Sequence, residues 1–189
     1  MKIDKRLLLA FVILIAGSVI YKVIPYETRS AFLGAPVLAA SLFSGSVINE
    51  KKYAFLIPLL ILFLGDLVMQ LMHWNNPVYS PGFYSGQITN YALIISLVTI
   101  GFFTNSRKYA SILIGAGLTA TLFFLMSNFM VWAQGYGLHT GKTLNTLYLT
   151  YIDGLPFYKN DLIGTVVFSL VFFTAYNFAF TSEKSQKLA

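Results

Sequence analysis

An all-α membrane protein is predicted by three features of this sequence. Of its 189 residues, 57% are hydrophobic and only 11% are charged, whereas a soluble domain carries about 25% charged residues. Apolar runs long enough to cross a bilayer recur along the chain and are separated by polar turns. The basic residues are scattered over those turns and the chain ends. We therefore predict six transmembrane helices in one bundle, which form a single integral membrane domain over residues 1–189.

The first two predicted spans are residues 6–25 and 31–48. We interpret the first as an uncleaved span, because its apolar run is longer than that of a signal peptide and no small-x-small cleavage site follows it. The second is rich in small residues, which let helix backbones approach closely. Ala35, Ala39 and Ala40 could serve packing within the bundle, which we favour, or could dock a helix of a partner membrane subunit.

The third predicted span, residues 53–73, carries Asp66, Gln70 and His73 in its second half. Their i, i+4, i+7 spacing places them on one face of a helix. A carboxylate at the centre of a bilayer costs about 2.5–3.5 kcal/mol on insertion scales, so Asp66 needs a cavity or a partner. A snorkelling or packing role is the alternative, and we favour a pathway or pocket.

Three further spans and two long loops complete the chain. The predicted spans are residues 89–104, 109–133 and 159–180. The loops, residues 74–88 and 134–158, are rich in aromatic side chains that suit a membrane interface or could cap a binding site. The second loop could contain a short helix around residues 144–152.

The basic residues predict the orientation. With both termini cytoplasmic, nine of them lie on the inner side and four on the outer side, namely Lys22, Arg29, Lys142 and Lys159. The positive-inside rule therefore favours cytoplasmic N- and C-termini and places both long loops outside. At 1.5 Å per residue, Asp66 then lies about 20 Å into its span, towards the outer leaflet.

Polar and aromatic side chains converge at this outer end, where we predict a small-molecule pocket. A few polar groups in an aromatic-lined cavity are typical of such sites. The predicted substrate-binding residues are Asp66, Gln70, Asn128, Trp132, Tyr151, Asn160 and Asp161. The alternative is that polar residues simply collect near helix ends, which explains Asp161 better than Asp66.

Several chemistries are excluded or disfavoured by residues that the sequence lacks. It has no cysteine, and its two histidines are far apart, so we expect no metal site and no cofactor. No P-loop and no hydrolase motif occurs, so we predict that the chain is not an enzyme and does not use ATP itself. No stripe of basic residues indicates nucleic acid.

Four blocks of this sequence resemble a family of small bacterial membrane proteins of unknown function. The blocks are residues 35–45, 54–68, 127–132 and 154–164. The family typically has Asn where this chain has Leu33, and often Asp where it has Thr165. No family role is therefore carried over to those two positions.

The size, six spans and outward pocket also resemble, in architecture, the substrate-binding S components of energy-coupling-factor vitamin transporters. That resemblance implies capture of a vitamin-like small molecule from outside, with a separate transmembrane coupling subunit and ATPases as partners. We expect a transport protein of this kind in the bacterial cytoplasmic (inner) membrane. The alternative is a non-transporting accessory protein that packs against a partner membrane subunit.

Overall fold

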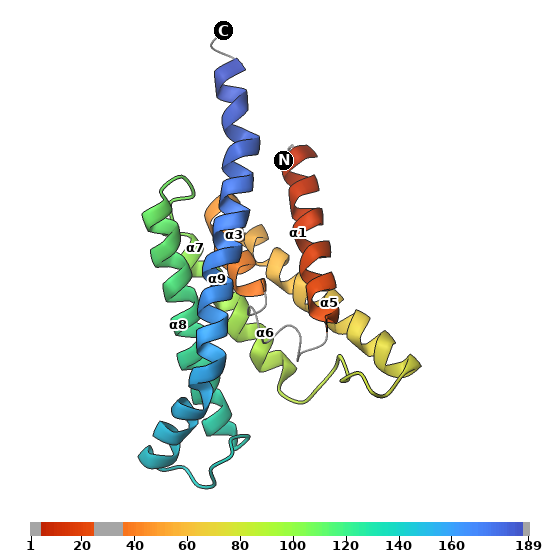
Figure 1. Ribbon diagram of the computed structural model, residues 1–189, viewed down its shortest axis with the longest axis vertical. Coiled ribbons are helices and arrows are strands. Elements are labelled where there is room, and N and C mark those ends of the chain that lie inside the picture. Colours follow the sequence, from red (N-terminus) through yellow and green to blue (C-terminus); the bar gives the residue numbers. More distant parts are fainter. Residues whose placement is uncertain (1–4, 25–35, 187–189) are drawn as a thin grey trace.

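The computed structural model describes residues 5–24 and 36–186, with side chains for residues 9–24 and 36–180. Within these ranges all regular structure is helical and no strand occurs, which confirms the predicted all-α class (Figure 1). The described helices are α1 (Lys5–Val23), α3 (Val37–Val47), α4 (Lys51–Ala54), α5 (Leu56–Asn75), α6 (Gln87–Ser96), α7 (Val98–Gly101), α8 (Tyr109–Gln134) and α9 (Leu144–Gln186). Since α4 continues into α5 and α6 into α7, they make six helical segments in the described part of the chain.

Three segments are long and apolar enough to cross a membrane, namely Lys51–Asn75, Tyr109–Gln134 and Leu144–Phe180. The other apolar helices are shorter: Leu9–Val23, Val37–Val47 and Gln87–Gly101. A helix needs about 20 residues to span the hydrocarbon core. The first residues of the predicted span 31–48 lie outside the described ranges. The structure is thus consistent with a membrane protein, and it shows three candidate spans.

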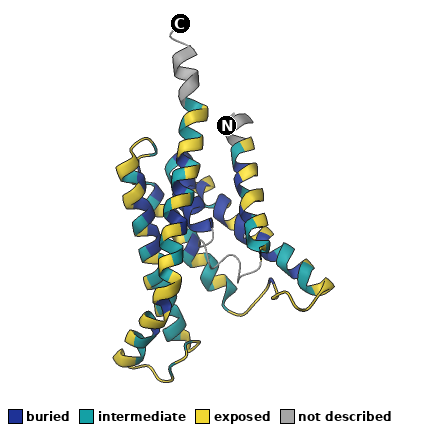
Figure 2. Ribbon diagram, in the orientation of Figure 1, coloured by how far each residue is buried: buried dark blue, intermediate teal, exposed yellow. Residues whose placement is uncertain are grey.

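Helix α3 forms the centre of the molecule. It packs against α5, α7, α8 and α9, and all its residues from Val37 to Gly45 are buried (Figure 2). Ala39 and Ala40 are 0% exposed, so they contact helices of the same chain. Of the two predicted roles, packing within the bundle and docking of a partner helix, these contacts correspond to packing. A partner helix has no access to these two side chains here, and Ala35 lies outside the described residues.

Glycines allow α3 and α7 to touch through their backbones. A Cβ added at Gly45 would overlap the carbonyl oxygen of Val98 and lie 3.0 Å from Gly101 Cα. A Cβ added at Gly101 would overlap the carbonyl oxygen of Leu42 and lie 2.8 Å from Gly45 Cα. Gly45 belongs to the run of small residues that predicted a close helix contact, and the contact is internal.

Helix α9 is longer than predicted, because it begins at Leu144 rather than near residue 159. Thr143 and Thr146 start it with a reciprocal cap, in which each hydroxyl oxygen accepts the other residue's backbone N–H, at 3.1 and 3.2 Å. Pro156 lies inside the helix, where proline costs about 3 kcal/mol. Packing against α8 along this stretch offsets that cost. Much of the predicted loop 134–158 is therefore helix.

The first turn of α1 and the last turns of α9 lie at the same end of the molecule in Figure 1. The loop between α7 and α8 lies towards that end, and the loop between α8 and α9 lies at the opposite end. Such an arrangement is compatible with termini on one side of a membrane.

Candidate functional site

Asp66 is the centre of a buried polar network. Its side chain lies on α5 and the residue is 1% exposed. Lys22 of α1 forms an ion pair with its Oδ1. Gln87 Nε2 donates a hydrogen bond to its Oδ2 at 2.6 Å, and the Tyr91 hydroxyl donates to the same oxygen. These four side chains, the Asp66 network, satisfy a carboxylate that would otherwise be costly in an apolar interior.

Local sequence explains how the partners reach Asp66. Lys22 lies in the last turn of α1, and its stem crosses Gly65, where an added Cβ would lie 2.8 Å from Lys22 Cδ. Gln87 and Tyr91 are spaced i, i+4 on α6, so they face the same neighbour. The sequence reasoning missed all three partners. The sequence offered one signal, a lysine at the end of an apolar run, and Lys22 was used only as one of the outer basic residues that predict the orientation.

A cavity of about 180 Å³ lies beside this network, and we call it the polar cavity. Its polar lining residues are Ser18, Tyr21, Lys22, Asn90 and Asp161. Apolar side chains from α3, α5, α6 and α8 line the rest. Helices distant in sequence thus meet around one small polar space, with Asp161 supplied by α9.

Two polar residues of the polar cavity have side-chain oxygens without a partner among the described residues, and the Ser18 oxygen is itself fully buried. Ser18 is 5% exposed, and its Oγ makes no hydrogen bond to any described residue. An unsatisfied buried hydroxyl costs about 1–3 kcal/mol. Asp161 is half-buried, and the described side chains provide no ion pair or hydrogen bond to its carboxylate. Among the described residues, Lys22 and Asp66 neutralise each other, so Asp161 carries the remaining charge of the cavity.

Asn90, which lines the polar cavity, is hydrogen-bonded to Tyr84 of the loop before α6. Asn90 Nδ2 donates a hydrogen bond to the Tyr84 hydroxyl at 3.0 Å. Partial burial raises the pKa of Tyr84 above its usual value, and the Asp66 carboxylate adds to this effect. The phenol therefore stays neutral and can accept the hydrogen bond from Asn90.

Gln70 holds the loop between α5 and α6 in place. Its side-chain oxygen accepts hydrogen bonds from the backbone N–H groups of Gly82 at 3.1 Å and Phe83 at 3.2 Å. A Cβ added at Gly82 would lie 2.6 Å from the Gln70 backbone nitrogen, so only glycine fits there. Gln70 was predicted to contact substrate, and the structure places it under this loop instead.

Asn128 was predicted to line the same site as Asp66, and its described contacts are with α8 and α9. Its Nδ2 donates a hydrogen bond to the Phe124 carbonyl of its own helix at 2.9 Å. Its side chain lies against Gly154 of α9, where an added Cβ would lie 2.5 Å from Asn128 Oδ1. Asn128 is thus part of the contact between α8 and α9.

Trp132 and Tyr151 belong to the same contact between α8 and α9. Trp132 Nε1 donates a hydrogen bond to Thr146 Oγ1 at 3.1 Å, and the Tyr151 hydroxyl donates to the Leu125 carbonyl at 3.0 Å. Both aromatic residues were predicted to line the substrate site, and neither lines the polar cavity. Trp132 lies on α8 and Tyr151 on α9. No spacing in the sequence indicates that these two helices contact each other through them.

Asp161 is the predicted site residue that lines the polar cavity, and Asp66 lies one ion pair away from it. Asn160 is its half-buried neighbour on α9. Among the described residues, no group of three His, Asp or Glu side chains is placed to hold a metal ion. The arrangement can therefore hold a small hydrogen-bond donor or cation by its carboxylate, hydroxyl and amide groups.

One comparison with known proteins gives a match. The sequence profile of a family described as "Family of unknown function (DUF6580)" matches residues 1–188. No curated protein and no solved structure matches the chain.

Proposed function

The chain belongs to this family of unknown function, DUF6580, and we propose, from its own residues, that it is a substrate-binding membrane transport protein. In this proposal the polar cavity captures the hydrogen-bond-donating or cationic group of a small molecule. Asp161 accepts that group, and Asn90 orients it. The Asp66 network fixes the wall of the cavity and does not itself bind the substrate.

One observation carries the proposal: the Asp161 carboxylate lines the polar cavity, and no side chain in the described part of the chain pairs with it. Buried polar groups are nearly always satisfied in native structures, and exceptions call for an explanation. A functional acid in a membrane protein commonly faces a pocket or pathway. An acid on α9 at the wall of a cavity that helices distant in sequence enclose favours a bound molecule over packing alone.

The size of the polar cavity limits what it can hold. At roughly 30 Å³ per water, 180 Å³ corresponds to about six water molecules. Pockets for whole drug-sized ligands measure about 300–1,000 Å³. The cavity therefore suits the polar part of a molecule rather than an entire vitamin.

The remaining parts of the proposal concern the assembly. Six spans with cytoplasmic termini would resemble an S component in the bacterial inner membrane. Because the chain has no P-loop, a coupling subunit and ATPases would have to supply the energy. The charge asymmetry supports this orientation.

Native mass spectrometry of the gently solubilised protein tests the capture of a small molecule. We expect wild type to retain a small-molecule adduct and Asp161→Asn to weaken its binding. Loss of a charge-assisted hydrogen bond of about 1.5–3 kcal/mol corresponds to ten- to a hundredfold in affinity. Asp153→Asn is the matched control, because Asp153 also lies on α9 but pairs with His139 at 2.8 Å, away from the cavity. No adduct on wild type, or equal binding by Asp161→Asn, would refute the proposal.

A further inference from the structure

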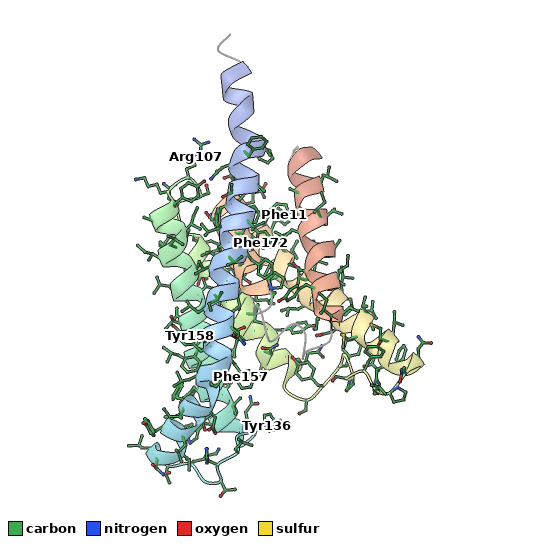
Figure 3. All side chains as sticks on the ribbon, viewed as in Figure 1. Phe11, Arg107, Tyr136, Phe157, Tyr158 and Phe172 are labelled. Atoms are coloured by element: carbon green, nitrogen blue, oxygen red, sulfur yellow. The ribbon has the colours of Figure 1, made fainter. Side chains whose placement is uncertain are left out.

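A larger apolar groove adjoins the polar cavity. It has a volume of about 530 Å³ and lies between α1 and α9, over Phe43 of α3. In Figure 3, Phe172 of α9 is labelled on this side of the molecule, and its ring centroid lies 6.0 Å from that of Phe43. Ser18, Tyr21 and Pro36 line both the groove and the polar cavity. The two spaces therefore meet at these three residues.

The groove and the cavity differ sharply in chemistry. The groove is lined by aliphatic and aromatic side chains, among them Ile13 from α1 and Phe168 from α9, and its hydroxyl groups come from Ser18 and two tyrosines. The cavity is lined by the Asp161 carboxylate, whereas the Ser18 hydroxyl oxygen is fully buried in its wall. An apolar groove thus adjoins a small cavity that carries a carboxylate.

We infer that the ligand is a cationic amphiphile, which names the substrate class of the proposed function and rests on it. Its apolar tail lies in the groove between α1 and α9. Its head group, an ammonium or another N–H-bearing cation, lies in the polar cavity and donates to Asp161. The groove lies within the size range of small-molecule pockets.

The charges of the site distinguish this ligand from other occupants. An anionic head group would be repelled by Asp161, and Lys22 is already neutralised by its ion pair with Asp66. An apolar tail without a head group, or an apolar transmembrane helix, would leave the Asp161 carboxylate without a partner among the described groups. A cation on an apolar tail satisfies both ends of the site.

Binding of dodecylamine, dodecanol and dodecanoate to the protein in phosphatidylcholine nanodiscs tests the inference. Affinities come from adduct populations in native mass spectra. We expect dodecylamine to bind more tightly than the other two. Asp161→Asn should weaken dodecylamine binding tenfold or more and leave dodecanol binding unchanged.

A matched pair of glycine variants tests the groove. A Cβ added at Gly17 or at Gly117 meets no atom within 4 Å, so a side chain can start at either position without a clash at its first carbon. Gly17 lines the groove and Gly117 does not. Gly17→Leu should fill the groove and weaken dodecylamine binding more than tenfold, because it displaces several methylene groups. Gly117→Leu should bind like wild type.

The outcomes separate the two proposals. If Asp161→Asn weakens dodecylamine binding and Gly17→Leu does not, the cavity captures a cation but the groove does not hold its tail, which overturns the inference alone. Dodecanoate binding as tight as that of dodecylamine overturns the charge assignment. If no amphiphile binds and wild type is a dimer that Gly17→Leu dissociates, the groove is an interface between copies. If neither Asp161→Asn nor Gly17→Leu changes binding, both proposals fail.

Discussion

At the scale of single residues, Asp66 and Asp161 show two different fates of a carboxylate in an apolar chain. Asp66 is satisfied by one ion pair and two hydrogen bonds from α1 and α6. Asp161 has no described partner and faces a cavity. Pairing offsets the cost of burying the Asp66 charge. Asp161 is the better candidate to contact a ligand.

Asp66→Asn is expected to destabilise the protein, because it leaves the Lys22 charge without its partner. Breaking a fully buried pair costs about 3–5 kcal/mol. The cost here should be smaller, since the Lys22 side chain is 32% exposed and water screens it. The double variant Lys22→Met, Asp66→Leu should be more stable than Asp66→Asn, as measured by thermal unfolding in detergent.

The control for this comparison of single and double variants is an exposed ion pair. It joins Lys52 and Glu50, whose charged atoms are 3.9 Å apart. Glu50→Gln should change stability by less than about 1 kcal/mol. If removing both charged partners, Lys22 and Asp66, costs as much as the sum of the single changes, the two residues are not coupled. That result would contradict the pairing of α1 with α5 through these side chains.

At the scale of secondary structure, backbone contact sets the position of α3. Its small residues leave no side chain between it and α7, and its apolar residues join the core that α5, α8 and α9 also build. In Figure 2 the buried residues concentrate around the centre, whereas exposed residues occur both in the loops and along the outer faces of the helices. Because α3 carries Val37 and Leu38 on the cavity wall, this contact also shapes the site.

Gly45→Ala and Gly101→Ala should each lower the thermal stability of the protein. The added methyl group would overlap a backbone oxygen, which cannot move aside as a flexible side chain can. Overpacking of this kind costs about 1–3 kcal/mol. Gly117→Ala is the control, because its Cβ meets open space and alanine favours a helix by about 0.8–1 kcal/mol over glycine. Wild-type stability of Gly45→Ala would show that α3 and α7 do not touch here.

At the scale of the whole molecule, the loops divide between two ends. The start of α1 and the end of α9 share one end with the loop before α8, and the loop before α9 lies at the other (Figure 1). With 43 residues, α9 is about 65 Å long, so it extends beyond a hydrocarbon core of roughly 30 Å. The orientation of the molecule in the membrane is a prediction from the distribution of its basic residues.

Cysteine labelling tests the predicted orientation, since the chain has no native cysteine. With cytoplasmic termini, cysteines at Ser80 and Thr140 should react with an impermeant reagent in intact cells. A cysteine at Ser106 should react only after permeabilisation. Thr140 is preferable to Gly141, whose φ of +91° disfavours any side chain. The reverse labelling pattern would invert the orientation and place the polar cavity near the inner surface.

The sequence alone determined the helical class, the membrane-like composition and the internal position of the small-residue helix α3. These properties depend on local hydrophobicity and residue size, which a reader of the chain sees directly. It also singled out Asp66 and Asp161, because a charge in an apolar run is conspicuous. The helical class is confirmed, whereas the six spans, the orientation and the function stay predictions.

Only the tertiary structure decided which polar residues meet. Lys22 and Asp66 are 44 residues apart in the chain, and no local pattern relates them. Asn128 and Trp132 share a helix face, as the spacing predicted, but that face packs on α9 rather than on α5. Spacing along one helix fixes which residues share a face. Which neighbour that face contacts depends on the packing of all helices together, and this packing brings Ser18, Asp161 and the apolar groove into one site.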